Sequence, residues 1–424
     1  MNSNQPQYKI IAATIKERIA SGQYKPGERI PPIRQLTEIF GVNKATVHRA
    51  FTLLQQEGLI ENKVGSGSFV RFPAAITLSS GGLDLRTDYL NESFFPYTQA
   101  QDIINDLFLQ EKARALSPTP VEGDPELIQV LSRQYHLPAD RMLIISGAQQ
   151  GLDLVSKVFS AKISESILFE DPTYPGAISL FKARHFVNMD SDGPNLKQFD
   201  ISISTPIRLF YAMPSVHNPT GLSYSESKKR AISHRAEQHD FYIIEDDYLG
   251  ELKPDAIRFV DIAPERTIHI KSFAQTMLAG IRLGLMVVPA TFYNQFINAK
   301  FSSDISSSGL LQKFLRKFID LGFYAKHIKI IQNKSDLRRR KLEKVLDGFS
   351  FIRYTPNQFG YSIWFASKKD IHPPDLAWSR GGEFSFSQKQ RSFFRIAFMH
   401  LDDDRFEQGL GYIKKILSQQ SFRF

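Results

Sequence analysis

Short apolar segments alternate with stretches of helical periodicity through the middle of this chain. Six of the segments have the length and composition of strands, namely residues 141–146, 167–170, 208–213, 241–245, 267–272 and 283–289. This alternation predicts a mostly parallel sheet that is covered by helices on both faces. Ligands in sheets of this kind bind beyond the carboxyl ends of the strands. We therefore expect a binding site where these segments end.

The chain has 424 residues, of which 42% are hydrophobic and 23% charged, as in ordinary globular proteins of roughly two or three domains. The absence of cysteine excludes disulfides, a thiolate nucleophile and cysteine-bound metals. We predict no metal site, since His217, His327 and His400 lack the spacing of metal ligands. No apolar run is long enough to span a membrane and no signal-like block opens the chain, so we expect a cytoplasmic protein without membrane contact.

The predicted strand ends carry side chains that suit one kind of ligand. Residues 146–150 follow a strand and open a helix, whose first amides can bind a phosphate. Tyr174 stands on a proline-containing turn, as an aromatic stacking platform does, and Asn218 stands on a second such turn. Asp246 ends an apolar strand with a carboxylate that needs a partner, for example the protonated nitrogen of a pyridine ring. Each feature alone also fits an ordinary loop.

Positive charge is concentrated at the start of the chain. Residues 1–72 contain ten lysines and arginines against five acidic residues, which gives +5 of the total net charge of +9. A domain that binds the phosphates of a nucleic acid carries such an excess. The basic run at residues 338–341 is predicted to be a solvated helix face and not a second DNA site.

The same first residues have the pattern of three short helices followed by a hairpin. Apolar periodicity predicts helices over residues 11–21 and 33–40, and a third that Asn43 caps and that is basic on its outer face. Residues 58–70 then form a predicted two-stranded wing with a glycine-rich tip. A helix-turn-helix of this kind can enter the major groove of DNA. The alternative is a small three-helix domain with incidental surface charge.

Residues 1–72 resemble the GntR-type winged helix. The match lies in Arg34-Gln35-Leu36-Thr37, in residues 41–47, in Glu57-Gly58-Leu59 and in residues 65–70. The resemblance implies contacts with double-stranded DNA from Arg34, Lys44, Thr46, Arg49 and the wing backbone at Gly65 and Gly67.

Residues 82–424 resemble the fold-type I pyridoxal phosphate (PLP) aminotransferases, from the motifs at strand ends together with residues 84–96 and the Gly123-Asp124-Pro125 turn. A GntR-type domain fused to this fold is the architecture of the MocR/GabR-like transcription regulators. The resemblance implies a winged helix over residues 1–72, a linker over 73–82, and an aminotransferase-like domain over 83–424. That domain is an α/β fold with a mostly parallel sheet and a smaller C-terminal α/β subdomain, and it forms a homodimer.

The resemblance also assigns roles to single residues. It implies phosphate contacts by Gly147, Ala148, Gln149 and Arg282, ring stacking by Tyr174, hydrogen bonds to the cofactor O3′ from Asn218 and Tyr248, pairing of Asp246 with the pyridine nitrogen, a further cofactor contact by Ser272, and an effector carboxylate bound by Arg395.

One departure from the family pattern concerns the residue that carries the chemistry. Where the family has its Schiff-base lysine, this chain has Gln275, in Ser272-Phe273-Ala274-Gln275. An amide is neither basic nor nucleophilic, so it cannot form the usual lysine aldimine. Lys271 is four strand residues away, roughly 13 Å, which is beyond the reach of a lysine. A second departure is the lack of a tyrosine between Lys112 and Gly123, where the family usually has one that reaches the partner's phosphate.

We therefore predict a DNA-binding transcription regulator that senses a small molecule and is not an enzyme. The expected ligand is PLP or a related vitamer held without a covalent bond, its amino-acid adduct, or an amino acid. Two alternatives remain open: a PLP-dependent aminotransferase with an accessory DNA-binding domain, and a regulator whose large domain is a ligand-free dimerisation scaffold. A buried carboxylate and two arginines at the predicted site favour a ligand.

Overall fold

The computed structural model describes residues 6–20, 24, 28–56, 59–63, 67–70, 83–159, 166–181, 184–356, 358–369, 371, 376–385, 390 and 392–421. The chain divides into two units, residues 1–80 and 81–424. The linker expected over residues 73–82 lies outside the described residues.

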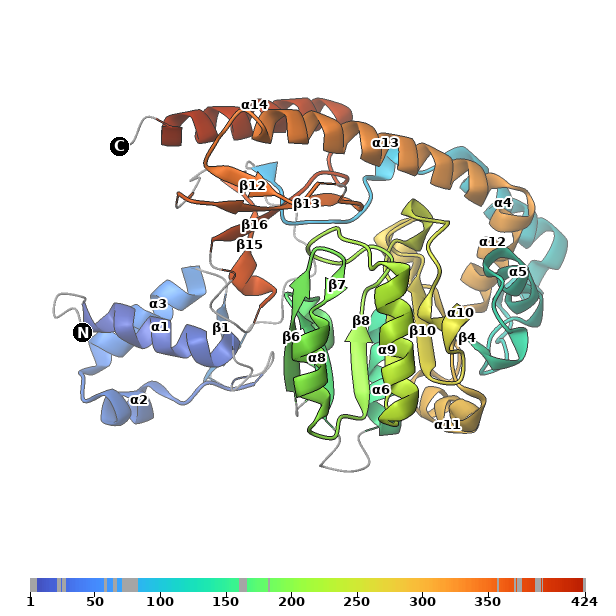
Figure 1. Cartoon of the computed structure of the whole chain (residues 1–424), viewed down its shortest axis with the longest axis horizontal. Coiled ribbons are helices and arrows are strands. Elements are labelled where there is room, and N and C mark those ends of the chain that lie inside the picture. Colours follow the sequence, from blue (N-terminus) through green and yellow to red (C-terminus); the bar gives the residue numbers. More distant parts are fainter. Residues whose placement is uncertain are drawn as a thin grey trace. The chain divides into compact units, whose positions relative to one another are not determined.

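The N-terminal unit has the predicted three helices and wing (Figure 1, blue). Its elements are α1 (Gln7–Ala20), α2 (Ile33–Phe40), α3 (Lys44–Gln56), β1 (Ile60–Lys63) and β2 (Gly67–Val70). The side chain of Asn43 caps α3, because its Oδ1 accepts a 2.9 Å hydrogen bond from the amide of Thr46. β1 and β2 are antiparallel, with Ile60 opposite Val70. The predictions of the helix-turn-helix and of the hairpin are confirmed.

The large sheet of the second unit has eight strands in the order β4-β11-β10-β9-β8-β5-β6-β7. They are β4 (Met142–Ile145), β5 (Ile167–Asp171), β6 (Arg184–Asp190), β7 (Gly193–Pro194), β8 (Leu209–Ala212), β9 (Tyr242–Asp247), β10 (Thr267–Ser272) and β11 (Gly284–Val287). The pairs from β10 through β6 are parallel, whereas β11 is antiparallel to both its neighbours and β7 is antiparallel to β6. The mostly parallel sheet is confirmed, and β6 and β7 extend it beyond the predicted segments.

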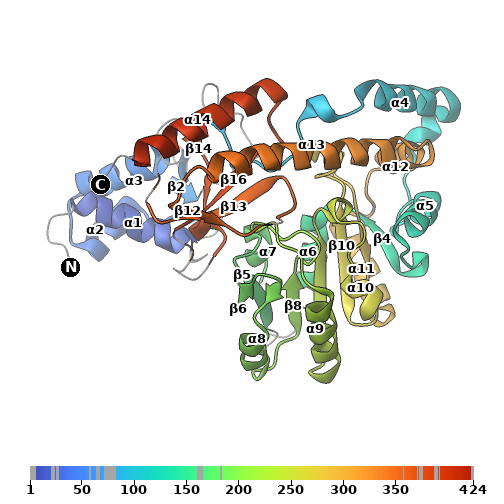
Figure 2. The same ribbon diagram turned by 45° about the horizontal axis from the view of Figure 1, so that its top comes forward.

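Helices cover both faces of this sheet (Figures 1 and 2). One face packs on α6 (Ala148–Phe159), α7 (Pro175–Ile178) and α11 (Tyr293–Asp304). The other face packs on α8 (Leu196–Ile203), α9 (Glu226–Gln238) and α10 (Phe259–Ile262), and near β4 and β11 on α4 (Tyr97–Glu111), α5 (Pro125–Tyr135) and α12 (Gly309–Asp320). Each face therefore has its own apolar core.

The smaller subdomain contains an antiparallel sheet in the order β12-β13-β16-β15. Its strands are β12 (Ile352–Tyr354), β13 (Ser362–Ser367), β15 (Ser379–Arg380) and β16 (Phe393–Ala397), and the helices α13 (Phe323–Leu346) and α14 (Asp403–Ser421) pack on them (Figure 2). A short parallel pair joins β3 (Leu83–Asp84) to β14 (Leu376–Ala377). This arrangement brings the segment after β3 against β16.

The basic run on α13 is not a solvated face throughout, which corrects the sequence prediction. Arg338 is only 1% exposed, and its guanidinium lies between the rings of Phe94 and Phe406 at 4.8 and 4.7 Å. It donates to the carbonyl oxygens of Phe398 and Leu401. Packing on the aromatic rings and these acceptors replaces the water that an exposed arginine would have.

Adjacent strands β9 and β10 set the geometry of the site. Ile270 lies opposite Asp246, and Lys271 lies opposite Asp247. Because side chains alternate along a strand, Asp246 faces the α6 side of the sheet and the Asp247–Lys271 pair faces the other side.

Candidate cofactor and effector site

Asp246 lies at the centre of what we call the Asp246 site. Its side chain is 4% exposed and accepts a 2.7 Å hydrogen bond from the hydroxyl of Tyr211 on β8. Burial raises the pKa of Asp246 to about 7; the Tyr211 hydrogen bond opposes this rise, and the charges of Asp247 and Glu170 add to it. A buried carboxyl of this kind is stabilised by a protonated ring nitrogen, because the added cation compensates the charge that burial penalises.

Gly147 and Arg282 lie against each other at the start of α6. Gly147 adopts φ +91°, and Arg282 adopts φ +46° and donates from Nη2 to the carbonyl of Ser146 at 2.8 Å. A β-carbon on Gly147 would lie 3.1 Å from Arg282 Nη2, so glycine allows the guanidinium to approach the helix start closely. The first amides of α6, at Ala148 and Gln149, face the same end of the helix. Helix amides and a guanidinium together form a phosphate site.

Tyr174 lies near the start of α6 and is influenced by the charge of Asp246. It precedes α7, and its hydroxyl lies 3.4 Å from Oε1 of Gln149. Burial raises the pKa of Tyr174, and the charges of Asp246 and Asp88 raise it further while Arg282 lowers it. The aromatic ring is therefore within electrostatic range of both ends of the Asp246 site.

Four side chains from distant segments meet in what we call the Asp88 cluster. Oδ2 of Asp88 accepts a 2.7 Å hydrogen bond from the Tyr248 hydroxyl, and it lies 3.4 Å from Nδ2 of Asn218 and 3.2 Å from Nη1 of Arg395. Arg395 Nη1 also donates to Oδ1 of Asn218 at 2.9 Å. The structure thus brings Asn218, Tyr248 and Arg395 together, and all three contact a carboxylate of the chain itself.

Sequence reasoning missed Asp88. Its partners Asn218, Tyr248 and Arg395 are 130, 160 and 307 residues away in the chain. An isolated aspartate in a short loop gives no signal of such contacts, because only the folded chain brings these segments together.

Gln275 follows β10 and lies beside the smaller subdomain. Its backbone oxygen accepts a 2.8 Å hydrogen bond from the Tyr361 hydroxyl. Its side-chain Oε1 is buried and has no hydrogen-bond partner among the described residues. Ser272, at the end of β10, uses its Oγ to accept from the amide of Ala274 at 3.2 Å. Gln275 therefore presents an unused buried acceptor, which a ligand with an N–H group can satisfy.

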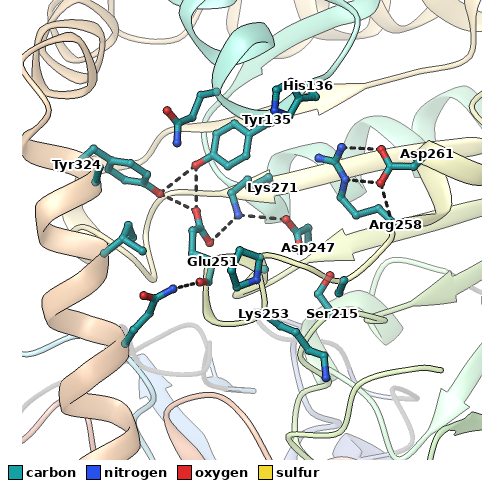
Figure 3. Close-up of a pocket in the computed structure, with 17 residues that line it drawn as sticks. Tyr135, His136, Ser215, Asp247, Glu251, Lys253, Arg258, Asp261, Lys271 and Tyr324 are labelled. Atoms are coloured by element: carbon teal, nitrogen blue, oxygen red, sulfur yellow. Dashed lines mark hydrogen bonds and ion pairs between the residues drawn. The ribbon is translucent and has the colours of Figure 1, made fainter. Parts of the chain in front are cut away.

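Lys271 lies on the opposite face of the sheet from Asp246. Figure 3 shows its contacts with Glu251 and Asp247. Its Nζ lies 2.8 Å from Glu251 and 3.1 Å from Asp247, at a cavity of about 520 Å³. Tyr324 and Tyr135 donate to the second oxygen of Glu251 at 2.6 and 3.0 Å. Burial lowers the pKa of Lys271, but the two carboxylates outweigh it and hold the pKa above the ordinary value. This lysine is a protonated ion-pair partner and not a free amine.

The N-terminal unit presents a basic surface. Arg34, Lys44 and Arg49 are exposed, and the Arg49 guanidinium lies 4.9 Å from the centre of the Tyr8 ring. The Thr46 hydroxyl donates to Oδ1 of Asn43 at 2.9 Å, so it helps to hold the side chain that caps α3.

The wing contributes glycines to the predicted DNA contacts. Gly67 begins β2 with φ +110°, and a β-carbon there would lie 2.8 Å from the Arg29 guanidinium. Gly65 lies outside the described residues. Glycine at position 67 therefore leaves room for the Arg29 side chain, which a residue with a β-carbon would obstruct.

The described residues contain neither a group of side chains placed to bind a metal nor a membrane-spanning helix. Within the described part of the chain, no group of three or more histidine, aspartate and glutamate side chains is placed to hold a metal ion. Among the same residues, no helix combines the length and the apolar character that a membrane span requires.

Comparison with known proteins matches both units. Residues 7–70 match the family described as "Bacterial regulatory proteins, gntR family", and residues 88–413 match "Aminotransferase class I and II". The chain is 30% identical to the HTH-type transcriptional regulator YcxD of Bacillus subtilis, over 80% of each protein. It is 25% identical to the HTH-type transcriptional regulator TauR of Rhodobacter capsulatus, over 95% of each.

A solved structure shows the same fold. The kynurenine aminotransferase of Pyrococcus horikoshii superposes with a TM-score of 0.74 at 22% identity, covering 82% of this chain and 93% of that one. The fold class predicted from the sequence is confirmed. The chain belongs to the MocR type of GntR-family transcription regulators, in which a DNA-binding winged helix is fused to an aminotransferase class I and II domain.

Proposed function

We propose that this regulator binds PLP or a related B6 vitamer without a covalent bond and that it does not catalyse transamination. The observation that carries the proposal is Gln275, an amide at the family's lysine position, beside a site that otherwise suits the vitamer. A side-chain amide does not form an imine with the aldehyde of PLP, and it is too weak a base to accept a proton at neutral pH. Lys271 does not replace it, since two carboxylates hold its ammonium on the other face of the sheet.

The residues present fit a phosphorylated pyridine. A bound vitamer supplies a phosphate, a flat ring and a basic ring nitrogen as recognition groups. We assign the phosphate to Arg282, Gly147 and the amides of Ala148 and Gln149, and the ring face to Tyr174. Asp246 pairs with the ring nitrogen, because its buried carboxyl has a pKa near neutrality and gains from a cationic partner. We assign further contacts with the vitamer to Ser272, Asn218 and Tyr248.

The two units act together in this proposal. Residues 1–72 bind duplex DNA, residues 73–82 link the units, and residues 83–424 bind the vitamer and form a homodimer. A twofold dimer presents two winged helices to two half-sites of an operator. We place the protein in the cytoplasm, with the DNA that it binds.

Titration calorimetry of the purified full chain with PLP and with pyridoxamine phosphate tests the proposal. We expect saturable binding, no visible Schiff-base absorbance on the protein, and no ligand fixed by borohydride. Covalent attachment of PLP to the unmodified chain contradicts the proposal. Failure of both vitamers to bind favours the ligand-free scaffold.

A further inference from the structure

Groups of the chain itself occupy both protons of Nη1 and one proton of Nη2 on the guanidinium of Arg395. Nη2 donates to the carbonyl of Arg86 at 2.6 Å, and Nη1 contacts Oδ2 of Asp88 and Oδ1 of Asn218. Phe384 covers the planar face at 4.6 Å, and Nε is buried without a partner in the described residues. Binding an external carboxylate in the paired manner of arginine requires two adjacent N–H donors. Both protons of Nη1 are used, so an external carboxylate can pair with Nη1 and Nη2 only by displacing Asp88 or Asn218.

Asp88 supplies the anion that an external carboxylate would otherwise bring. Its Oδ2 takes the hydroxyl of Tyr248, the amide of Asn218 and the guanidinium of Arg395. The Asp88 side chain is 17% exposed and that of Arg395 is 7% exposed, so the pair is largely removed from water. A second carboxylate entering here meets a like charge at low dielectric, and it must displace Asp88 or Asn218 to pair with Nη1 and Nη2.

Gln275 adds an acceptor to the same region of the fold. Its Oε1 is buried and unpartnered among the described residues, and Tyr361, which holds its backbone, is within electrostatic range of Asp88. One anion and one orphan acceptor favour an N–H donor on the ligand and disfavour a carboxylate. Such a built-in repulsive group is a common way to reject a wrong ligand.

We infer that Asp88 is a specificity-determining residue: it occupies the carboxylate position on Arg395, and the site takes the amine form of the vitamer and rejects vitamer–amino acid adducts. The ligand class is a phosphorylated pyridine bearing an amine without a carboxylate. This inference rests on the proposed function, and it replaces the carboxylate role that family resemblance gives to Arg395.

A matched pair of stable ligands tests it on the full chain. N-(5′-phosphopyridoxyl)-methylamine and N-(5′-phosphopyridoxyl)-glycine differ only in the carboxylate of the second compound. We expect calorimetry to show that the unmodified chain binds the methylamine compound at least about tenfold more tightly. In Asp88→Ala the preference reverses, and the glycine compound gains at least about tenfold, because Arg395 is then free to bind its carboxylate.

Three further variants test whether the effect comes from the charge of Asp88 and from its contact with Arg395. Asp88→Asn keeps the side-chain volume and removes the charge, so it shows the same relaxation of preference if Asp88→Ala folds poorly. In Asp88→Ala combined with Arg395→Met, the gain for the glycine compound is lost. Asp403→Ala removes the acidic partner of another buried arginine, because Oδ1 of Asp403 lies 2.7 Å from Nη2 of Arg338. It serves as the matched control, and it leaves the ligand preference unchanged.

The results distinguish a failure of the role given to Asp88 from a failure of vitamer binding. Equal binding of both compounds by the unmodified chain, or an unchanged preference in both Asp88 variants, overturns the role of Asp88 while vitamer binding stands. If neither compound binds to any of these proteins and neither PLP nor pyridoxamine phosphate binds to the unmodified chain, the proposed function fails and the inference fails with it.

Discussion

The hydroxyl of Tyr211 donates a 2.7 Å hydrogen bond to the carboxyl group of Asp246, and both residues are buried in the sheet. Burial nevertheless raises the pKa of Asp246 to about 7, well above the value of about 3.9 expected in an unfolded chain. The folded protein therefore binds this proton more tightly than the unfolded chain does. The resulting stabilisation is complete below about pH 4 and is lost as the pH rises to about 7.

Asp246→Asn removes this titration. We expect the variant to gain in melting temperature relative to the unmodified protein as the pH rises from about 4 to 7, with no further change at higher pH. The linkage amounts to roughly 1.4 kcal/mol for each unit of pKa shift. Thermal unfolding without ligand at several pH values measures it. A difference between the two proteins that does not vary with pH contradicts the assignment.

Tyr211→Phe provides a control for the same group. Loss of a hydrogen bond that favours the ionised form raises the pKa of Asp246 further. The pH window of lost stability keeps its lower limit near pH 4 and extends further upward, and the same unfolding series detects the change.

Gln275→Lys returns an amine to the end of β10. Because Asp246, Arg282 and Tyr174 are in place, we expect PLP to form a Schiff base with the introduced lysine, seen as visible absorbance and as a mass increase after borohydride reduction. Gln275→Ala is the matched control and shows neither signal. Absence of both signals in Gln275→Lys, with PLP binding intact, means that residue 275 does not face the vitamer.

Lys271→Met tests the ion-pair cluster on the other face. The change leaves Asp247 and Glu251 buried without their cation, which costs about 3–5 kcal/mol in pairs of this kind. Although burial alone would raise the pKa of Asp247, the Lys271 charge holds it at about 2. The stability from this pairing is present above about pH 4 and is lost as the pH falls toward 2, so the variant loses most at neutral pH.

Denaturant unfolding at pH 7 and at about pH 3 measures this effect, and vitamer binding is expected to survive where the variant is folded. A larger loss at pH 3 than at pH 7 argues against an ion pair as the cause. Loss of vitamer binding by a folded Lys271→Met would place Lys271 in the site and not behind it.

Lys44→Ala combined with Arg49→Ala removes two exposed cations from α3. We expect operator affinity to fall at least about tenfold and the dependence on salt to become weaker, because fewer counterions are released on binding. Fluorescence polarisation at several salt concentrations measures both quantities. Arg340→Ala, an exposed arginine of the second unit, is the control and leaves DNA binding unchanged.

The sequence predicted those elements that depend on residues close together in the chain. The apolar segments at β8, β9 and β10 and the Asn43 cap each follow from residues close in the chain. β6 was missed because Arg184–Asp190 mixes polar with apolar residues at the edge of the sheet. The strand-end pattern singled out residues 146–150, Tyr174, Asn218 and Asp246, and family resemblance added Arg282, Tyr248, Ser272 and Arg395. Asp88 depends on contacts between distant segments.

Arg338 shows that helical periodicity predicts which side chains are buried better than charge does. It shares the buried face of α13 with Ile331, Ser335, Leu342 and Leu346, at helical spacing. The periodic signal was therefore present in the sequence, but the neighbouring basic residues were read as one solvated group.

The alternation of side chains on β10 has a consequence for how this protein can change. Lys271 and Ser272 are consecutive, yet Lys271 contributes to the ion-pair cluster and Ser272 lies on the Asp246 side, with the sheet between them. Under the proposed function, substitutions on the Asp246 side change which ligand is bound, while the ion pairs that stabilise the fold stay intact on the other side. Two neighbouring residues of one strand can therefore evolve under separate constraints.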